Sequence, residues 1–411
     1  MRRVAITGMG VISPIGNTIE LFQENLLAGV CGIDYITHFD TDDYKVKIAA
    51  EVKDFNITDY IDKSEARRMD LFTQYAMAAA EQAVVQSGIA GALAPERLGV
   101  YVGSGIGGMD TFVTTTDKFL NGGPRKVSPL FIPMMISNMA AGNIAIRYKA
   151  MGPCLPVVTA CATSSHALGE AYRAIRFGYA DAIIAGGAEA AINGLAVAGF
   201  TNSTALSTRN DPVDSSIPFD ARRDGFVIGE GAAIVILEEY EHAKNRGAKI
   251  FGEMTGYANT CDAYHITAPH SEAEGAANAI RLALEESGYN KEMKLYYNAH
   301  GTSTPLNDKA ETVALKKVLG EEDARKVHIS STKSMTGHML GAAGAVEAIA
   351  CVVALQTGEI PPTIGYKEPD PDCDLNYTPN KKVKADIDLA ISTSLGFGGH
   401  NAALAIRKGD R

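Results

Sequence analysis

The sequence predicts an α/β protein in which helical layers alternate with largely buried strands. Short apolar runs rich in β-branched residues alternate with alanine-rich helical stretches along all 411 residues, and such alternation is typical of strands covered by helices on both faces. The same order of elements also occurs twice: a strand, a small polar turn and an alanine-rich helix are predicted in 157–176 and again in 327–355. We therefore predict two duplicated halves, 1–250 and 251–411.

Each strand is predicted from an apolar run bounded by glycine or polar residues. In chain order the runs are RVAITG, LGVYVGSG, CLPVVTAC, DAIIAGG, AAIVILEEY, KLYYNAHG, VHISSTK and LAISTSLGFGG. Helices are predicted from apolar residues at helical spacing. These stretches are LFTQYAMAAAEQAVVQSG, the residues after Cys161, GAANAIRLALEESG, KAETVALKKVLG and AAGAVEAIACVVALQTG.

Composition narrows the classes of partner and compartment. The net charge of −10 argues against a nucleic acid partner. No run reaches the roughly 18 apolar residues of a membrane span, so no membrane partner is expected. The start, MRRVAITGMGVISPIG, lacks the long apolar core of a signal peptide. The six cysteines show no CxxC pair and no zinc spacing, so we expect free thiols, no metal, and a cytoplasmic location or an organelle matrix.

Two glycine-rich segments resemble dinucleotide-binding loops. GMGVIS at 8–13 has serine in place of the third glycine, whereas GSGIGG at 103–108 matches the G-x-G-x-x-G pattern. However, no acidic residue ends a strand some 20 residues later, as that fingerprint requires. We therefore expect tight packing near a pocket and no cofactor.

Cys161 is the first candidate for chemistry. It follows the strand-like residues VVT and precedes a helix for which Thr163, Ser164 and Ser165 are N-cap candidates. A helix N-terminus favours the thiolate and lowers the thiol pKa. A buried structural cysteine is the alternative reading, and that is how we interpret Cys154, Cys261, Cys351 and Cys373.

Two histidines and a lysine follow later strands. His300 lies in YYNAHGTSTPLND, at a strand end in a loop of small polar residues. His338 lies in SSTKSMTGHMLGAAGAVEA, five residues after Lys333, for which we expect burial beside a carboxylate, with Glu311 as the partner. A cysteine hydrolase needs one histidine and an orienting acid. Two histidines suit stabilisation of an enolate or thioester oxyanion by two donors.

These motifs resemble those of the β-ketoacyl-acyl carrier protein synthases. The resemblance rests on TACATSS, NAHGTSTPLND, SSTKSMTGHMLGAAGAVE and GFGGHN, and it extends from VAITGMGVISPIGN to SLGFGGHN. The similarity is greatest to the type II synthases of dissociated fatty acid synthesis. It implies a thiolase-like fold with a layered αβαβα arrangement, a homodimer, and acyl carrier protein as partner.

The resemblance also implies residue roles in a decarboxylative Claisen condensation. Cys161 would take the acyl chain as a thioester, and His300 and His338 would bind the malonyl thioester carbonyl. Lys333 with Glu311 would organise these imidazoles. The backbone N–H groups of Cys161 and Phe397 would form an oxyanion hole, with Phe397 as a gatekeeper. Thr302 and Thr304 would line the malonyl site, and His400 has no assigned role.

Two surfaces follow from the same resemblance. An apolar acyl tunnel is expected to reach the dimer interface, lined by Ile106, Phe200 and the segment 131–139. Core packing is the alternative for each of these. An acidic carrier protein is expected to contact a set of basic residues, for which ordinary solvated charge is the alternative: Lys63, Arg67, Arg68, Arg125 and Lys126.

Related activities remain as alternatives. A polyketide ketosynthase would carry the same motifs and chemistry. A CoA-dependent thiolase would need a second cysteine in a C-x-G-G-G setting, where this chain has GFGGHN. A non-catalytic partner subunit would lack Cys161.

Overall fold

The computed structural model describes residues 1–409 and contains one large mixed sheet whose strand order is symmetric about its middle except for one additional edge strand, β9. The order is β4-β5-β6-β1-β7-β13-β12-β8-β9. The first group of strands comprises β4 (Leu98–Gly103), β5 (Ala182–Glu189), β6 (Gly231–Glu239) and β1 (Val4–Ile12). The second comprises β7 (Gly252–Cys261), β13 (His400–Lys408), β12 (Leu389–Gly396), β8 (Leu295–Asn298) and β9 (His328–Ser330).

The two groups repeat one pairing plan. The central strands β5 and β6 pair antiparallel, as do β12 and β13, while β4 runs parallel to β5 and β8 parallel to β12. An antiparallel pairing of β1 with β7 joins the groups. This symmetry confirms the predicted fold of duplicated halves.

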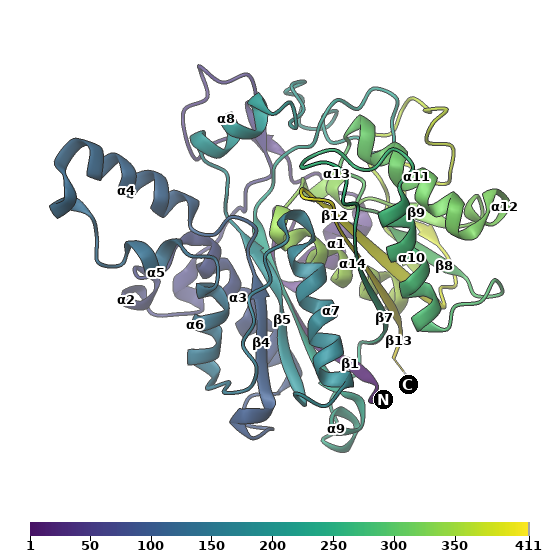
Figure 1. The fold of residues 1–411 in the computed structure, drawn as a ribbon, viewed down its shortest axis with the longest axis horizontal. Helices are drawn as coiled ribbons and strands as arrows, with labels where there is room; N and C mark the ends of the chain where they lie inside the picture. Colours follow the sequence, from purple (N-terminus) through teal and green to yellow (C-terminus); the bar gives the residue numbers. More distant parts are fainter. Residues whose placement is uncertain (410–411) are drawn as a thin grey trace.

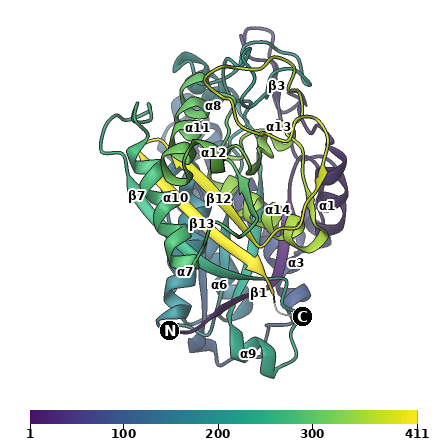
Figure 2. The ribbon, with the colours of Figure 1, turned by 90° about the vertical axis from the view of Figure 1, so that its right-hand side faces the viewer.

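Helices cover both faces of the strands and fill the space between the two groups (Figure 1). Helix α3 (Leu71–Ser87) packs on β1 and β6, and α10 (Glu274–Ser287) packs on β7 and β13. Helices α7 (Thr163–Arg176) and α14 (Ala343–Thr357) form the central layer. In the turned view, α10 and α11 (Pro305–Leu319) lie beside β12 and β13 (Figure 2).

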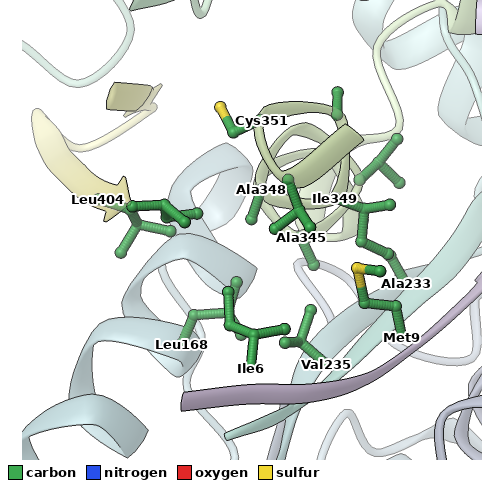
Figure 3. Close-up of a cluster of buried hydrophobic side chains, with 14 of the residues drawn as sticks. Ile6, Met9, Leu168, Ala233, Val235, Ala345, Ala348, Ile349, Cys351 and Leu404 are labelled. Atoms are coloured by element: carbon green, nitrogen blue, oxygen red, sulfur yellow. The ribbon is translucent and has the colours of Figure 1, made fainter. Parts of the chain in front are cut away.

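The centre of the core lies around α14. Ala345, Ala348 and Ile349 of α14 lie close to Leu168 of α7 and to Val235 of β6 (Figure 3). The segment Leu340–Thr357 has a mean hydropathy of 1.6 and is long and apolar enough to cross a membrane by length and composition, contrary to our expectation. However, 89% of it is buried inside the structure, as for the core helix of a folded domain.

The remaining elements are short or peripheral. The other helices are α1 (Ile19–Ala28), α2 (Lys63–Ala66), α4 (Met109–Gly122), α5 (Phe131–Met135), α6 (Met139–Tyr148), α8 (Gly194–Asn202), α9 (Tyr240–Asn245), α12 (Glu321–Ala324) and α13 (Lys333–Thr336). The short strands are β2 (Asp34–Tyr35), β3 (Ile48–Ala49), β10 (Glu359–Ile360) and β11 (Val383–Lys384).

Some sequence-based expectations about local structure are wrong. The run CLPVVTAC forms only an isolated bridge from Cys154 to Val100, because it lies outside β4 at the edge of the sheet. The strands β7 and β13 were not predicted, since their alanine, glycine and polar residues weaken the apolar pattern. Cys351 and Cys373 are buried as packing residues should be, but Cys154 and Cys261 are exposed.

Candidate active site

Cys161 lies in a strained turn that leads into the central helix α7. It is the middle residue of a 3-10 turn, Ala160–Ala162, and Ala160 has a left-handed φ of 50°. Such a backbone is costly for alanine, and strain of this kind is common at functional sites. The helix is capped by no side chain, contrary to the prediction for Thr163, Ser164 and Ser165. Its first N–H groups therefore stay available at the nucleophile.

The hydroxyl groups of that first helical turn instead fix its surroundings. Thr163 accepts a hydrogen bond from the Thr159 N–H at 2.9 Å, and Ser164 accepts one from the Ala345 N–H at 2.9 Å. The Ser165 and Ser394 hydroxyls lie 2.8 Å apart. These contacts tie the turn that carries Cys161 to α14 and to β12 of the other half.

The pKa of the Cys161 thiol does not follow the sequence-based expectation. The pKa of the thiol is raised to about 12, mainly by burial and to a smaller extent by the charge of Glu189. The charge of Lys333 and hydrogen bonds from the backbone N–H groups of Phe397 and Cys161 lower it, but burial prevails. The expectation of a net lowered pKa is therefore wrong for the ligand-free protein, since loss of hydration outweighs the helix terminus.

His300 and His338 are brought together from separate loops. Their ring centroids are 5.3 Å apart at an interplanar angle of 86°. Each residue is 2% exposed. Burial and the charge of Lys333 hold both imidazole pKa values well below the ordinary value. Both rings are therefore neutral at neutral pH and can each donate one N–H.

The ring nitrogens of these histidines have unused capacity for hydrogen bonds. Nδ1 of His300 and both ring nitrogens of His338 are buried without a hydrogen-bond partner in the part of the chain that the structure describes. Buried polar atoms normally find partners, so orphaned ones need an explanation. A substrate oxygen entering the cavity would supply one.

A single cavity joins the nucleophile to both imidazoles. Its volume is about 550 Å³, and Cys161, His300 and His338 all line it. The other predicted residues in its wall are Ile106, Phe200, Thr302, Thr304 and Phe397. Phe397 is 37% exposed, follows β12 directly, and lies at the strand end whose Gly396 packs against the turn of Cys161.

Lys333 lies behind the cavity, and its predicted partner is wrong. The lysine is 1% exposed and forms an ion pair with Glu347 of α14. Burial raises the Glu347 pKa to about 7, although the charge of Lys333 lowers it. Glu347 is the lone acid in an otherwise apolar helix, a signal that could have identified it.

Glu311 instead holds the loop of His300. Its carboxylate accepts hydrogen bonds from the N–H groups of His300 at 2.7 Å and Gly301 at 2.8 Å. Two hydroxyls, those of Tyr297 and Thr393, also donate to it. The carboxylate from the helix behind His300 therefore fixes a backbone and does not pair with Lys333.

The predicted acyl-tunnel residues divide between two cavities. Ile106 and Phe200 line the main cavity, while Met135, Ile136 and Ser137 line a second cavity of about 420 Å³. Ile106 belongs to both walls, so it separates the two spaces. The segment 131–139 is therefore beyond Ile106 and not beside Cys161.

The predicted basic contacts are all exposed: Lys63, Arg67, Arg68, Arg125 and Lys126. The first three lie in and directly after α2, and the last two lie in the turn Pro124–Lys126 after α4. Asp70, two residues after Arg68, accepts hydrogen bonds from the N–H and hydroxyl of Thr111 in α4. This contact links the chain after α2 to α4 on one side of the molecule (Figure 1).

His400, which has no predicted role, lies half-buried at the start of β13. Its ring centroid is 6.3 Å from that of His166. Within residues 1–409, no group of three or more His, Cys, Asp or Glu side chains is arranged to hold a metal ion. Glu189 also lines the cavity and was missed by the sequence analysis.

Known proteins share the whole architecture. Residues 1–243 match the beta-ketoacyl synthase N-terminal domain, and residues 251–367 match the C-terminal domain. The chain is 50% identical to the 3-oxoacyl-[acyl-carrier-protein] synthase 2 of Synechocystis sp. over 409 residues, 99% of this chain and 98% of that protein. The enzyme of the same name from Staphylococcus aureus is 50% identical over 408 residues, with the same coverage.

Solved structures of ketosynthases have the same fold as this chain. The ishigamide ketosynthase/chain length factor is 37% identical with a TM-score of 0.92, and a beta-ketoacyl synthase from Burkholderia phymatum is 36% identical with the same TM-score. Each comparison covers 100% of both chains. With both domains matched in order and the nucleophile, histidines and glycine turn all facing one cavity, the chain belongs to the β-ketoacyl synthase family of condensing enzymes.

Proposed function

We propose that the protein is a 3-oxoacyl-acyl carrier protein synthase of type II fatty acid synthesis. The observation that carries this proposal is the shared cavity, which presents one thiol and two neutral imidazoles with unused ring nitrogens. Full-length similarity to relatives named 3-oxoacyl-[acyl-carrier-protein] synthase 2 supports the choice of reaction.

The first half-reaction transfers an acyl chain to Cys161. The sulfur attacks the thioester carbonyl of acyl-ACP, and the thiol of the carrier protein leaves with a proton. The N–H groups of Cys161 and Phe397 both favour the thiolate, so in this proposal they also stabilise the tetrahedral oxyanion that forms beside it. Because the thiol is protonated at rest, a base must take its proton during attack, and a neutral imidazole can do so.

The second half-reaction joins malonyl-ACP to the held chain. His300 and His338 donate to the malonyl thioester oxygen, the carboxylate leaves as carbon dioxide, and its bonding electron pair forms the enolate. The enolate carbon attacks the acyl-Cys161 carbonyl, and the Cys161 thiolate leaves. Thr302 and Thr304, whose hydroxyls are 2.9 Å apart, provide a polar wall for the malonyl arm.

Lys333 and Glu311 act from behind the reacting atoms. Burial, helped by the charge of Lys333, keeps both imidazoles neutral, and this charge favours negative charge in the cavity. Glu311 fixes the backbone at His300 and Gly301. In this proposal neither residue touches substrate, and each positions or tunes His300.

A polyketide ketosynthase is the second candidate. A solved neighbour of this kind is a ketosynthase bound to a hexaketide, in complex with the acyl carrier protein of a type II PKS; it is 34% identical to this chain with a TM-score of 0.92. The relatives named for 3-oxoacyl synthesis are closer in sequence, at 50% identity. A thiolase is disfavoured because the loop after β12 carries no cysteine.

The carrier protein and a second subunit complete the proposal. The exposed cations on α2 and on the turn after α4 would dock the acidic carrier protein. A second copy of the chain would cover the open edge beside β4, where Leu155 is 47% exposed and Val158 is 51% exposed. Such apolar side chains at a sheet edge are typical of an interface. We propose a cytoplasmic homodimer, which light scattering at micromolar concentration would test.

Product masses test the proposed reaction. The purified protein is incubated with an acyl-ACP primer and excess malonyl-ACP, without reducing enzymes. Fatty acid synthesis predicts one 3-oxoacyl-ACP, two carbons longer than the primer. A series of poly-β-keto products would indicate the polyketide alternative, and release of free acid without a longer product would indicate a hydrolase.

A further inference from the structure

A buried carboxylate in the cavity has no part in the reaction described above. Glu189 is the last residue of β5, is 0% exposed, and lines the same cavity as Cys161. A fully buried glutamate is uncommon and needs compensation by hydrogen bonds or charge. The contacts of Glu189 therefore indicate why the site retains it.

Every hydrogen bond to Glu189 comes from a donor without formal charge. Oε1 accepts from the Ser104 hydroxyl at 2.8 Å and the Ile106 N–H at 3.1 Å. Oε2 accepts from the Gly105 N–H at 2.8 Å and the Gly341 N–H at 3.0 Å. The Ser104 oxygen accepts from the Gly107 N–H, so its hydroxyl proton is directed to the carboxylate. These donors favour the ionised carboxylate, whereas burial, the larger effect, raises the pKa of Glu189 above its ordinary value.

The glycine-rich segment at 103–108 is therefore a cradle for an internal anion. A Cβ at Gly105 would lie 2.7 Å from Oε2 of Glu189, and one at Gly341 would lie 2.8 Å from it. Only glycine allows the backbone to approach the carboxylate this closely from both sides. The motif that resembled a phosphate-binding loop binds the side chain of Glu189 instead.

Glu189 connects the two halves at equivalent turns. Gly341 is the middle residue of the 3-10 turn Leu340–Ala342 before α14, as Cys161 is in the turn before α7. Leu340 has a left-handed φ of 46°, close to the 50° of Ala160. The N–H of Gly341 thus corresponds to the N–H of Cys161, and it donates a hydrogen bond to the Glu189 carboxylate, which fills this second turn.

We propose that Glu189 is a positioning residue for the condensation: it clamps the acyl-facing wall at Gly105 and Ile106 to the turn that follows His338, and its negative charge, in the cavity that Cys161 also lines, restrains ionisation of Cys161. This inference rests on the proposed function. The geometry supports the clamp, because one carboxylate bonds three backbone N–H groups from two segments. The electrostatic part agrees with the direction in which Glu189 moves the Cys161 pKa.

Two substitutions distinguish the effect of the Glu189 charge from the effect of its hydrogen bonds to the two segments. Glu189→Gln keeps the shape but removes the charge and one acceptor, whereas Glu189→Asp keeps the charge but withdraws the carboxylate by one methylene. The first readout is the pH dependence of Cys161 alkylation by iodoacetamide, followed on the Cys161 peptide because the exposed Cys154 and Cys261 would react too. The second readout is the KM for acyl-ACP in condensation.

The two variants should differ in a defined way. Glu189→Gln should lower the apparent pKa of Cys161 by about one unit, giving about tenfold faster alkylation at a fixed pH below that pKa. Glu189→Asp should leave that profile unchanged and raise the KM for acyl-ACP several-fold. Ser104→Ala removes one donor and keeps the charge, so it should behave as a weaker Glu189→Asp and remains informative if a Glu189 variant fails to fold.

Two results would overturn the inference. One is an alkylation profile of Glu189→Gln that superimposes on that of the unsubstituted protein. The other is a KM within twofold for both Glu189→Asp and Ser104→Ala. Alkylation requires no carrier protein, so failure of the proposed function would show as absent condensation by the unsubstituted protein, with the alkylation comparison still intact.

Discussion

The turn before α7 and the turn before α14 have the same backbone but opposite chemistry. Each is a 3-10 turn that starts at a residue with left-handed φ and leads into a central helix. The first carries Cys161 and faces a strand end at Gly396, where a Cβ would lie 3.3 Å from the Cys161 nitrogen and no side chain fills the space. The second carries Gly341 and faces a strand end at Glu189, whose carboxylate fills the space.

The difference shows that duplication supplied the geometry and that a few side chains decided its use. A strained turn at a helix N-terminus presents N–H groups that favour negative charge in both halves. In the first half that charge would develop on a substrate, whereas in the second the side chain of Glu189 supplies it.

Removal of the thiol makes the first turn resemble the second and should abolish acyl transfer. For Cys161→Ala we expect no acyl adduct on the intact protein after incubation with acyl-ACP, because among residues 1–409 no other cysteine lines the cavity. Mass spectrometry of the intact chain measures this directly, with Cys154→Ala as the exposed-cysteine control. An adduct of undiminished yield on Cys161→Ala would place the nucleophile elsewhere.

The imidazoles should matter more for the second half-reaction than for the first. Since loss of one oxyanion donor typically costs about 10²–10³-fold in rate, His300→Ala and His338→Ala should slow malonyl-ACP decarboxylation to that extent. Acyl loading should fall much less. Both rates come from rapid-quench mass analysis, and equal loss of both steps in each variant would contradict this division of roles.

Alkylation of Cys161 and decarboxylation of malonyl-ACP should depend on pH in different ways. With a folded pKa of about 12, the Cys161 thiolate fraction should rise about tenfold per pH unit, and alkylation should rise with it between pH 7 and 9. Both imidazole pKa values are well below the ordinary value of 6.5, so malonyl decarboxylation should show no imidazole step between pH 6 and 8. An alkylation plateau below pH 8 would show that the helix terminus outweighs burial.

The second turn should not tolerate even a methyl group. A Cβ at Gly341 would lie 2.5 Å from the Gly105 nitrogen, so Gly341→Ala should destabilise the fold by about 1–3 kcal/mol through overpacking. Gly199→Ala is the matched control, since Gly199 lies in α8 with no atom near its Cβ position. Denaturant unfolding measures both, and equal stability of the two variants would show that the second turn is not closely packed.

The smallest effect is expected at the surface. Arg68→Ala should weaken turnover of acyl-ACP about two- to fivefold at low salt, and the difference should shrink as salt screens the contact. Acylation by a small thioester, which needs no carrier protein, should be unchanged. Glu65→Gln is the matched surface variant, and equal sensitivity of both thioesters in Arg68→Ala would exclude a docking role.

Local patterns predicted the reacting residues but not all of their partners. Cys161, His300 and His338 follow apolar runs and small polar turns, so their loops could be located from the sequence. Glu311 was paired with Lys333 because it follows His300 in the chain, yet the ion pair forms with Glu347, fourteen residues after the lysine. A contact between residues of α13 and α14 decides this, and the only hint in the sequence is the single acid of α14.

Glu189 was missed for a related reason. Its donors are 84 and 152 residues away in the chain, at Gly105 and Gly341. The two glycine segments could be read only as separate motifs until the fold joined them. The direction of the Cys161 pKa shift could not be predicted from the sequence either, because it depends on how deeply the thiol is buried.

A single-turnover chase tests the central claim most directly. Cys161 is first loaded with one acyl chain, the acyl-enzyme is purified, and malonyl-ACP is added while carbon dioxide and all acyl species are measured. The account predicts one carbon dioxide for each chain that leaves Cys161, with every chain recovered as 3-oxoacyl-ACP. Carbon dioxide released while the chain stays on Cys161, or a chain lost to water, would contradict it.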